Sequence, residues 1–217
     1  MTAIVTGAAR GIGTAVADRL ARDHDVLRVD LDPNVNGIQA DITKPEDRAR
    51  VIDAAGPVDV LVNNAGITRD ARIVKMTEEE FLQVIRVNLG AAYELTMALD
   101  FADGASVISL ASRAYLGNFG QFNYSASKGG LVGMTRALAL QLAPKVRVNA
   151  IAPSLTASEM TLAMPEKVLE KMIASIPMGR MGEPEEIAAT VAALASKDMA
   201  YVTGQVVVAC GGRSLAP

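Results

Sequence analysis

The chain has 217 residues, which suits one domain with a full hydrophobic core. Half of the residues are apolar, a fifth are charged and the formal net charge is −3 without a basic cluster, so nucleic acid is not the expected main partner. No apolar run reaches the ~18 residues of a membrane span, no metal site is expected, and the single cysteine, Cys210, excludes an intrachain disulfide and fits a reducing cytoplasm.

The N-terminal segment predicts a strand, a glycine-rich turn and a helix, in that order. Residues 2–6 are a β-favouring run, Gly7, Gly11 and Gly13 follow, and a helical pattern extends through Leu20. Glycines let the backbone approach a pyrophosphate, and a helix N-terminus offers free N–H groups and the positive end of its dipole. The spacing is G-x-x-x-G-x-G rather than G-x-G-x-x-G, and the same glycines can also serve a tight turn alone.

Residues 26–30 are predicted as the second strand, which ends in Asp30. A carboxylate at this position can accept hydrogen bonds from the adenosine ribose hydroxyls, and it repels a 2′-phosphate. Arg10 in the glycine loop has the opposite tendency, because a base there can meet a 2′-phosphate. We weigh Asp30 more heavily, so NAD(H) is favoured over NADP(H), which stays open as the alternative.

The next segment is expected to contain a loop, a short strand, a helix and a buried strand. Residues 32–39 hold too many turn-forming residues for a helix, and residues 37–40 read as a strand. Thr43 is expected to cap a helix that extends to about residue 55. Residues 58–62 are apolar except for Asp59, and such a run is typical of a parallel strand buried on both faces.

Polar residues follow this strand and recur within the next helix. Asn64 and Gly66 follow the carboxyl end of this strand, which is where ligands bind in parallel sheets, although they can equally form a simple turn. Thr77 begins a capping-box sequence, and the helix is expected to continue to about Leu99. Asn88 lies within it among apolar neighbours, so we expect it to be a structural bridge or part of a proton path.

The segment from Ser112 to Lys128 is the candidate catalytic centre. Residues 105–110 predict a strand with Ser112 just past its end, and the following helix places Tyr124 and Lys128 one turn apart on one face. A phenol titrates near pH ~10, and a nearby ammonium is expected to lower its pKa, so that it exchanges protons with a carbonyl or alcohol oxygen. A serine hydroxyl can hold the same oxygen. A Tyr and a Lys at this spacing also occur by chance on ordinary amphipathic helices.

The C-terminal part is predicted as strand 147–152, an irregular methionine-rich region at 154–182, a helix at about 185–194 and a strand at 204–209. The methionine-rich region suits a pliable lid over an apolar substrate, or plain core packing. Strands and helices alternate along the whole chain. The sequence therefore predicts one α/β domain, residues 1–217, with a Rossmann-like, doubly wound parallel sheet of about seven strands.

Together these motifs resemble the short-chain dehydrogenase/reductase family over essentially the full chain. They occur in the family's order: Thr6-Gly7-x-x-x-Gly11-Ile12-Gly13, Asn63-Asn64-Ala65-Gly66, Asn88, Ser112, Tyr124-x-x-x-Lys128 and Arg147-Val148-Asn149-x-x-x-Pro153. Within the family the chain looks most like the 3-oxoacyl-thioester reductases, through residues 64–70, 117–124 and 203–205. Cys210 before two glycines resembles an NADH-using subgroup that acts on 3-oxoacyl-CoA.

The resemblance implies a role for each catalytic residue. NADH gives hydride to a ketone carbon and Tyr124 protonates the developing alkoxide. Lys128 holds the nicotinamide ribose and lowers the pKa of Tyr124, Ser112 orients the carbonyl oxygen, and Asn88 holds a water that links Lys128 to solvent.

The resemblance also implies the cofactor-binding residues. The pyrophosphate is implied to be bound by Gly7, Arg10, Gly11, Ile12 and Gly13, and the adenosine ribose by Asp30. Asp41 and Ile42 flank the adenine, and the cleft is lined by Asn64, Ala65 and Gly66. The nicotinamide carboxamide meets Pro153, Ser154 and Thr156.

The sequence departs from the family pattern at three places. The helix usually found between the second and third strands is missing, and Ser154 replaces a usual glycine, so a shifted backbone is expected there. The linker before the serine strand carries Asp100 and Asp103 and no base. Reductases that dock acyl carrier protein tend to have basic residues there, which favours CoA thioesters or free ketones as substrates.

Two other functions stay open at this point. The same chemistry can serve a cyclic or steroid-like alcohol, a sugar or a small diketone. A nicotinamide-binding sensor without turnover is the less favoured reading, since such proteins usually lose the Tyr or the Lys. The resemblance further implies a homotetramer or homodimer, located in the cytoplasm.

Overall fold

The protein folds around one parallel sheet of seven strands in the order β3-β2-β1-β4-β5-β6-β7. The computed structural model describes residues 1–162 and 164–215. The strands are β1 Thr2–Thr6, β2 Asp25–Asp30, β3 Ile38–Gln39, β4 Val58–Asn63, β5 Phe101–Leu110, β6 Val146–Pro153 and β7 Val206–Ala209. The predicted fold class and strand number are confirmed.

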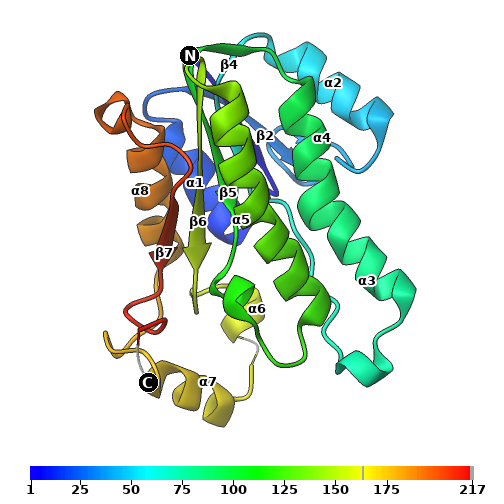
Figure 1. Ribbon diagram of the computed structural model, residues 1–217, viewed down its shortest axis with the longest axis vertical. Helices are drawn as coiled ribbons and strands as arrows, with labels where there is room; N and C mark the ends of the chain where they lie inside the picture. The colour runs from blue at the N-terminus through cyan, green and yellow to red at the C-terminus, as the bar shows by residue number, and fades with distance from the viewer. Residues whose placement is uncertain (163, 216–217) are drawn as a thin grey trace.

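Helices cover both faces of this sheet (Figure 1). The α-helices are α1 Gly11–Leu20, α2 Pro45–Ala55, α3 Glu78–Ile85, α4 Ala91–Ala98, α5 Phe122–Leu142, α6 Glu159–Leu162, α7 Glu166–Ala174 and α8 Pro184–Ala195. Short turns of other helix types are η1 Ile73–Lys75, η2 Arg86–Gly90, η3 Arg113–Leu116 and η4 Lys197–Met199. Within the described part of the chain, no helix has the length and apolar character needed to cross a membrane.

The strands feed two separate cores because their side chains alternate between the two faces. Ile4, Leu61 and Val107 pack in one core with α2, α4 and α5. Their strand neighbours Val5 and Val62 pack in the other core, with α1 and α8. The near-continuous apolar runs of the sequence therefore reflect burial on both sides of the sheet.

The strand order reverses at β1, whose two neighbours are β2 and β4. In open parallel sheets, ligands bind in the crevice outside the carboxyl ends of the strands at such a reversal. The glycine loop follows β1 and Asn64 follows β4, so the topology brings both motifs to this point.

The connection between β2 and β3 contains no helix within residues 31–37, as predicted. Asp32 organises this loop: its Oδ1 accepts hydrogen bonds from the backbone N–H of Asn34 at 2.8 Å and from the side-chain amide of Asn34 at 2.9 Å. Gly37 is required next, because a Cβ there would lie 2.2 Å from the carbonyl oxygen of Arg28.

The expected cap of α2 is wrong. Lys44, not Thr43, occupies the N-cap position, and it makes no side-chain capping bond. The backbone N–H and the hydroxyl of Thr43 instead donate to Asp41 Oδ1 at 3.0 and 2.7 Å, which places Thr43 in a turn around the Asp41 carboxylate.

The region 154–182 is more regular than expected, because it contains α6 and α7. Leu169, Met172 and Ile173 are the half-buried residues of α7, and their spacing is helical. The expectation of an irregular segment was therefore wrong for α7, which begins after Pro165.

Arg147 joins the end of α8 to β6. Its guanidinium donates to the carbonyl oxygens of Leu194 at 2.9 Å, Ser196 at 3.1 Å and Ala195 at 3.2 Å. These oxygens lie at the C-terminal end of α8, where carbonyl groups lack partners within the helix.

We expect Arg147→Met to lower the free energy of unfolding by about 2–3 kcal/mol, because it leaves buried carbonyl groups without donors. Arg22, an exposed arginine, gives the matched control, and Arg22→Met should change stability by less than about 0.5 kcal/mol. Urea unfolding of the three proteins measures the difference. Equal losses in the two variants would contradict this role.

Candidate active site

Helix α5 carries Tyr124 and Lys128 on one face at the carboxyl end of β5. Lys128 is buried, and its Nζ lies 5.5 Å from the centre of the Tyr124 ring. The same Nζ donates to the carbonyl oxygen of Leu110, the last residue of β5, at 2.6 Å. This buried hydrogen bond ties the helix to the strand that precedes Ser112.

Burial changes the acidity of both groups. It lowers the pKa of Lys128 to about 8, because the ammonium is desolvated. Burial also raises the pKa of Tyr124 above its usual value, a hydrogen bond with Ser112 lowers it by a smaller amount, and the charge of Asp70 raises it slightly. The expected lowering of the Tyr124 pKa by Lys128 is therefore not found, since desolvation dominates the pKa of Tyr124 and the Lys128 ammonium is bonded to the Leu110 carbonyl.

Ser112 meets Tyr124 at the start of η3. Ser112 has an extended backbone, and its Oγ accepts a hydrogen bond from the backbone N–H of Ala114 at 3.1 Å. The interaction of this hydroxyl with the phenol is one of the causes that lower the pKa of Tyr124, so the two side chains lie next to each other. Two hydroxyl groups are thus adjacent where a carbonyl oxygen can accept from both.

Asn88 connects the loop after β4 to α5. Its Oδ1 accepts from the backbone N–H of Ile67 at 2.8 Å, and its Nδ2 donates to the carbonyl of Ile67 and to Ser127 Oγ, both at 3.0 Å. A Cβ on Gly66 would lie 3.2 Å from Asn88 Oδ1 and 3.6 Å from Lys128 Nζ. Asn88, Gly66 and Lys128 therefore converge.

Asn88 lies in η2, a π-helical turn between α3 and α4 within one continuous helical segment. Such turns widen a helix by one residue and recur at functional sites. The expectation of one helix to about Leu99 is confirmed in its extent, because helical backbone continues from Glu78 through η2 to Ala98, and the π-helical turn within it is the feature that was not expected.

The glycine loop packs closely against the loop after β4. A Cβ on Gly13 would lie 1.9 Å from the carbonyl oxygen of Gly7. Asn64 Nδ2 donates to the carbonyl oxygens of Thr6 and Gly7 at 2.9 Å each, and Thr6 Oγ1 accepts from the backbone of Asn64 at 3.1 Å. Thr6 is a site-forming residue that the sequence places in the glycine motif without a role, and its position at the end of β1 was the available signal.

The first turn of α1 is open. Arg10 is its N-cap residue and makes no side-chain capping bond. Gly11 has a φ of +56°, and nothing described lies within 4 Å of a Cβ built there. A helix N-terminus with uncapped N–H groups and free space in front of it fits an anionic group such as a pyrophosphate.

Asp30 organises this loop as well as ending β2. Its Oδ2 accepts from the backbone N–H of Ala9 at 2.8 Å, and its Oδ1 accepts from that of Asp32 at 3.0 Å. Each oxygen retains lone pairs for a further donor. Asp41 and Ile42 follow β3, where Asp41 bonds to Thr43 in the turn before α2 and to Asp47 in its first turn.

Residues 153–156 leave β6 toward the lid. The backbone N–H of Ser154 donates to the carbonyl of Ala209 at 3.0 Å, and Thr156 Oγ1 donates to the carbonyl of Ser154 at 3.3 Å. Ser154 has no positive φ, so its backbone does not need the freedom of glycine. Its buried Oγ has no hydrogen-bond partner among the described residues, which leaves it free for a ligand.

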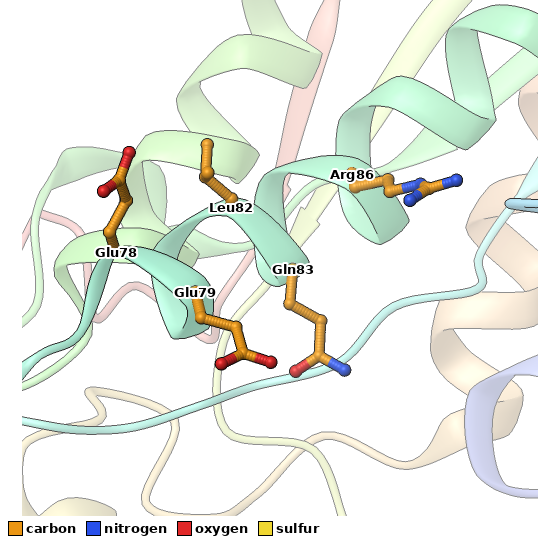
Figure 2. A pocket seen from close by; sticks show the side chains of 5 residues that line it. All are labelled: Glu78, Glu79, Leu82, Gln83 and Arg86. Atoms are coloured by element: carbon orange, nitrogen blue, oxygen red, sulfur yellow. The ribbon is translucent and has the colours of Figure 1, made fainter.

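A hollow of about 450 Å³ on the outside of α3 is not part of this site. Glu78, Glu79, Leu82, Gln83 and Arg86 line it. Figure 2 shows that these side chains project from one helix in different directions and do not converge on a common point.

The lowered pKa of Lys128 predicts a pH-dependent stability. Between pH 8 and the usual lysine value of 10.5, the unfolded chain binds a proton that the folded protein does not. The free energy of unfolding should therefore rise with pH in this window, relative to Lys128→Met. The raised pKa of Tyr124 acts in the opposite sense, but only above pH ~10.

Urea unfolding of the wild type and Lys128→Met at several values from about pH 7.5 to about pH 9.5 measures the difference. The contributions of other titrating groups to the pH dependence are the same in both proteins, so they cancel in this comparison. A difference in stability that stays constant across the window would contradict the lowered pKa.

Comparisons with known proteins agree with this geometry. Residues 7–214 match the family model described as "Enoyl-(Acyl carrier protein) reductase". The chain is 39% identical to the 3-oxoacyl-[acyl-carrier-protein] reductase of Thermotoga maritima, over 96% of each chain. It is 40% identical to the acetoacetyl-CoA reductase of Rhizobium meliloti, over 99% of this chain and 98% of the relative.

A solved structure is similar over nearly the whole molecule. The short-chain dehydrogenase/reductase "Glucose/ribitol dehydrogenase" from Brucella melitensis has a TM-score of 0.92 and 31% identity, covering 98% of this chain and 96% of the other. A family match over almost all of the chain, and relatives of this identity and coverage, show one relationship: the chain is an oxidoreductase of the short-chain dehydrogenase/reductase family.

Proposed function

We propose that this protein reduces the ketone of a 3-oxoacyl thioester to the 3-hydroxyacyl thioester, with NADH as the preferred cofactor. The observation that carries the proposal is the adjacency of the Ser112 and Tyr124 hydroxyls above the buried Lys128. The names of the Thermotoga and Rhizobium relatives, a 3-oxoacyl-[acyl-carrier-protein] reductase and an acetoacetyl-CoA reductase, support the substrate class.

Each catalytic side chain has a distinct role in the proposal. Ser112 and Tyr124 hold the ketone oxygen with two hydrogen bonds, and Tyr124 donates its proton as negative charge develops there. The raised pKa of Tyr124 keeps the phenol protonated at neutral pH, which suits a general acid in the reducing direction. Lys128 binds the nicotinamide ribose, and Asn88, which is held in place by Ile67, binds a water that links Lys128 to solvent.

The residues of the crevice fit a nicotinamide dinucleotide. The open first turn of α1 receives the pyrophosphate, and Asp30 binds the adenosine ribose. The unpartnered Ser154 Oγ binds the carboxamide end of the cofactor, together with Pro153 and Thr156. The bound dihydronicotinamide supplies the hydride equivalent for the ketone carbon. Asp41, Ile42, Asn64, Ala65 and Gly66 complete the walls, although Asn64 also has the structural role described above.

The preference for NADH rests on Asp30. Its carboxylate is fixed at the glycine loop by two backbone N–H groups, so its charge stays close to the adenosine ribose and repels a 2′-phosphate. Arg10 is exposed and forms no described ion pair, which leaves it able to meet a 2′-phosphate. We give Asp30 more weight because it is held in position and Arg10 is not.

The acidic linker before β5 supports CoA as the acyl carrier. Asp100 lies there and Asp103 lies in the first residues of β5, and Lys145 pairs with Asp100 across 3.6 Å between exposed side chains. This pair leaves no net positive surface to attract an acidic carrier protein. Residues 154–182 are proposed as the substrate lid, since they leave the site at Ser154 and carry the methionines Met172, Met178 and Met181.

A sugar or another polyol is the second candidate substrate. The Brucella structure, whose title names glucose/ribitol dehydrogenase, shares the fold and 31% identity with this chain. The same Ser112 and Tyr124 arrangement acts on any secondary alcohol or ketone, so the lid determines the choice between the two substrate classes.

We expect the purified protein to oxidise NADH in the presence of acetoacetyl-CoA. This reaction should be faster than the same reaction with NADPH, and faster than oxidation of NADH with a simple ketone that lacks the thioester. The initial rate at which the absorbance of the reduced cofactor falls, at about 340 nm, measures each of the three reactions. Activity with NADPH alone would show that Arg10 outweighs Asp30. Preference for a sugar or a simple ketone would overturn the thioester assignment.

Tyr124→Phe separates catalysis from cofactor binding. Removal of the phenol hydroxyl should lower kcat by about 10²–10⁴-fold, the usual contribution of a positioned acid, with little change in the Kd for NADH. Turnover measures the first effect, and titration of NADH fluorescence the second. Unchanged turnover would contradict the mechanism, and a wild type that binds NADH but reduces no carbonyl would favour the sensor.

A further inference from the structure

Two arginines lie close to the proposed carbonyl site without a part in the reaction so far. Arg113 directly follows Ser112 as the first residue of η3. Arg213 follows β7 after the turn at Cys210. The η3 turn lies near β7, because Tyr115 of η3 belongs to the same hydrophobic cluster as Val206 and Val208 of β7. Figure 1 shows the end of the chain after β7 at the same lower end of the molecule as α6 and α7.

Neither guanidinium has an acidic partner among the described side chains. The Nε–H of Arg113 is buried and, within residues 1–162 and 164–215, has no hydrogen-bond acceptor. Buried donors of this kind are nearly always paired in folded proteins, so this one indicates an acceptor that arrives with a ligand.

The two positive charges act on each other. Burial, and next the charge of Arg113, lower the pKa of Arg213, with a small opposite effect of Cys210. Like charges held close together favour an anion between them, and guanidinium groups offer forked donors that match a carboxylate.

The position of Arg213 is fixed by the turn before it. Gly211 has a φ of +59°, and a Cβ there would lie 2.7 Å from Ile176 in the lid segment. The carbonyl of Gly211 accepts from the backbone N–H of Met178 at 3.1 Å. The backbone that carries Arg213 is therefore attached to the lid.

We propose that Arg113 and Arg213 bind a carboxylate carried by the substrate itself, beside the ketone that Ser112 holds. This inference rests on the proposed function, because it uses the position of the reacting carbonyl. The phosphates of CoA are separated from the thioester by the whole pantetheine arm, so they do not reach a residue next to Ser112. The substrate class is then a 3-oxoacyl thioester whose acyl chain carries a second, free carboxylate.

A matched pair of substrates tests the proposal. We expect the wild type to reduce 3-oxoadipyl-CoA with a kcat/KM at least ~10-fold higher than that for its methyl ester, which lacks only the charge. The ratio should fall toward one in Arg113→Gln and in Arg213→Gln. Arg22→Gln, which removes an exposed charge far along the chain, should leave the ratio unchanged. Equal kcat/KM values for acid and ester in the wild type, or a ratio unaffected by both arginine variants, would overturn the proposal.

A binding measurement tests the anion site without turnover. Glutarate should raise the Tm of the wild type more than dimethyl glutarate does, and this difference should disappear in Arg113→Gln and Arg213→Gln. If neither thioester is reduced but glutarate stabilises the protein through these arginines, the anion site stands and the proposed reaction fails. If thioesters are reduced but glutarate has no arginine-dependent effect, the reaction stands and the anion site fails.

Discussion

The hydrogen bond from the buried Lys128 ammonium to the carbonyl of Leu110 is the interaction on which the candidate site depends. Burying a charged amino group is costly unless it is paired, so helix α5 is held at the position along β5 where Lys128 Nζ reaches the last carbonyl of the strand. That position places Tyr124 beside Ser112, which leaves the same strand two residues later. A single desolvated group thereby fixes the relation between the helix and the strand that carry the three reactive side chains.

The walls of the crevice are tied to this centre by polar side chains at the carboxyl ends of neighbouring strands. Asn88 holds Ile67 and Ser127, and Asn64 holds the glycine turn, so the loops after β1 and β4 are part of one hydrogen-bonded unit with α5. The two hydrophobic cores below give these loops rigid supports. A rigid frame suits hydride transfer, which requires fixed distances between cofactor and substrate.

The fold and the neighbourhood of the site followed from local patterns in the sequence, because strand alternation, glycine spacing and the Tyr124/Lys128 spacing are local signals. The errors arose where a distant or competing partner decides the structure. Asn88 in the π-helical turn bonds to Ile67, 21 residues away in the chain, and Thr43 bonds to Asp41 instead of capping α2. The net acidity of Tyr124 depends on burial by the whole fold, and no spacing in the sequence reports it.

The central claim is that a nicotinamide hydride reaches a ketone carbon while Tyr124 supplies the proton to oxygen. The most direct measurement is reduction of acetoacetyl-CoA with NADH deuterated at nicotinamide C4, on the face that transfers, followed by mass and NMR analysis of the product. The account predicts one deuterium on C3 of the 3-hydroxybutyryl group, and none on its hydroxyl after exchange with water. A product without deuterium at C3, formed at the same rate, would contradict it.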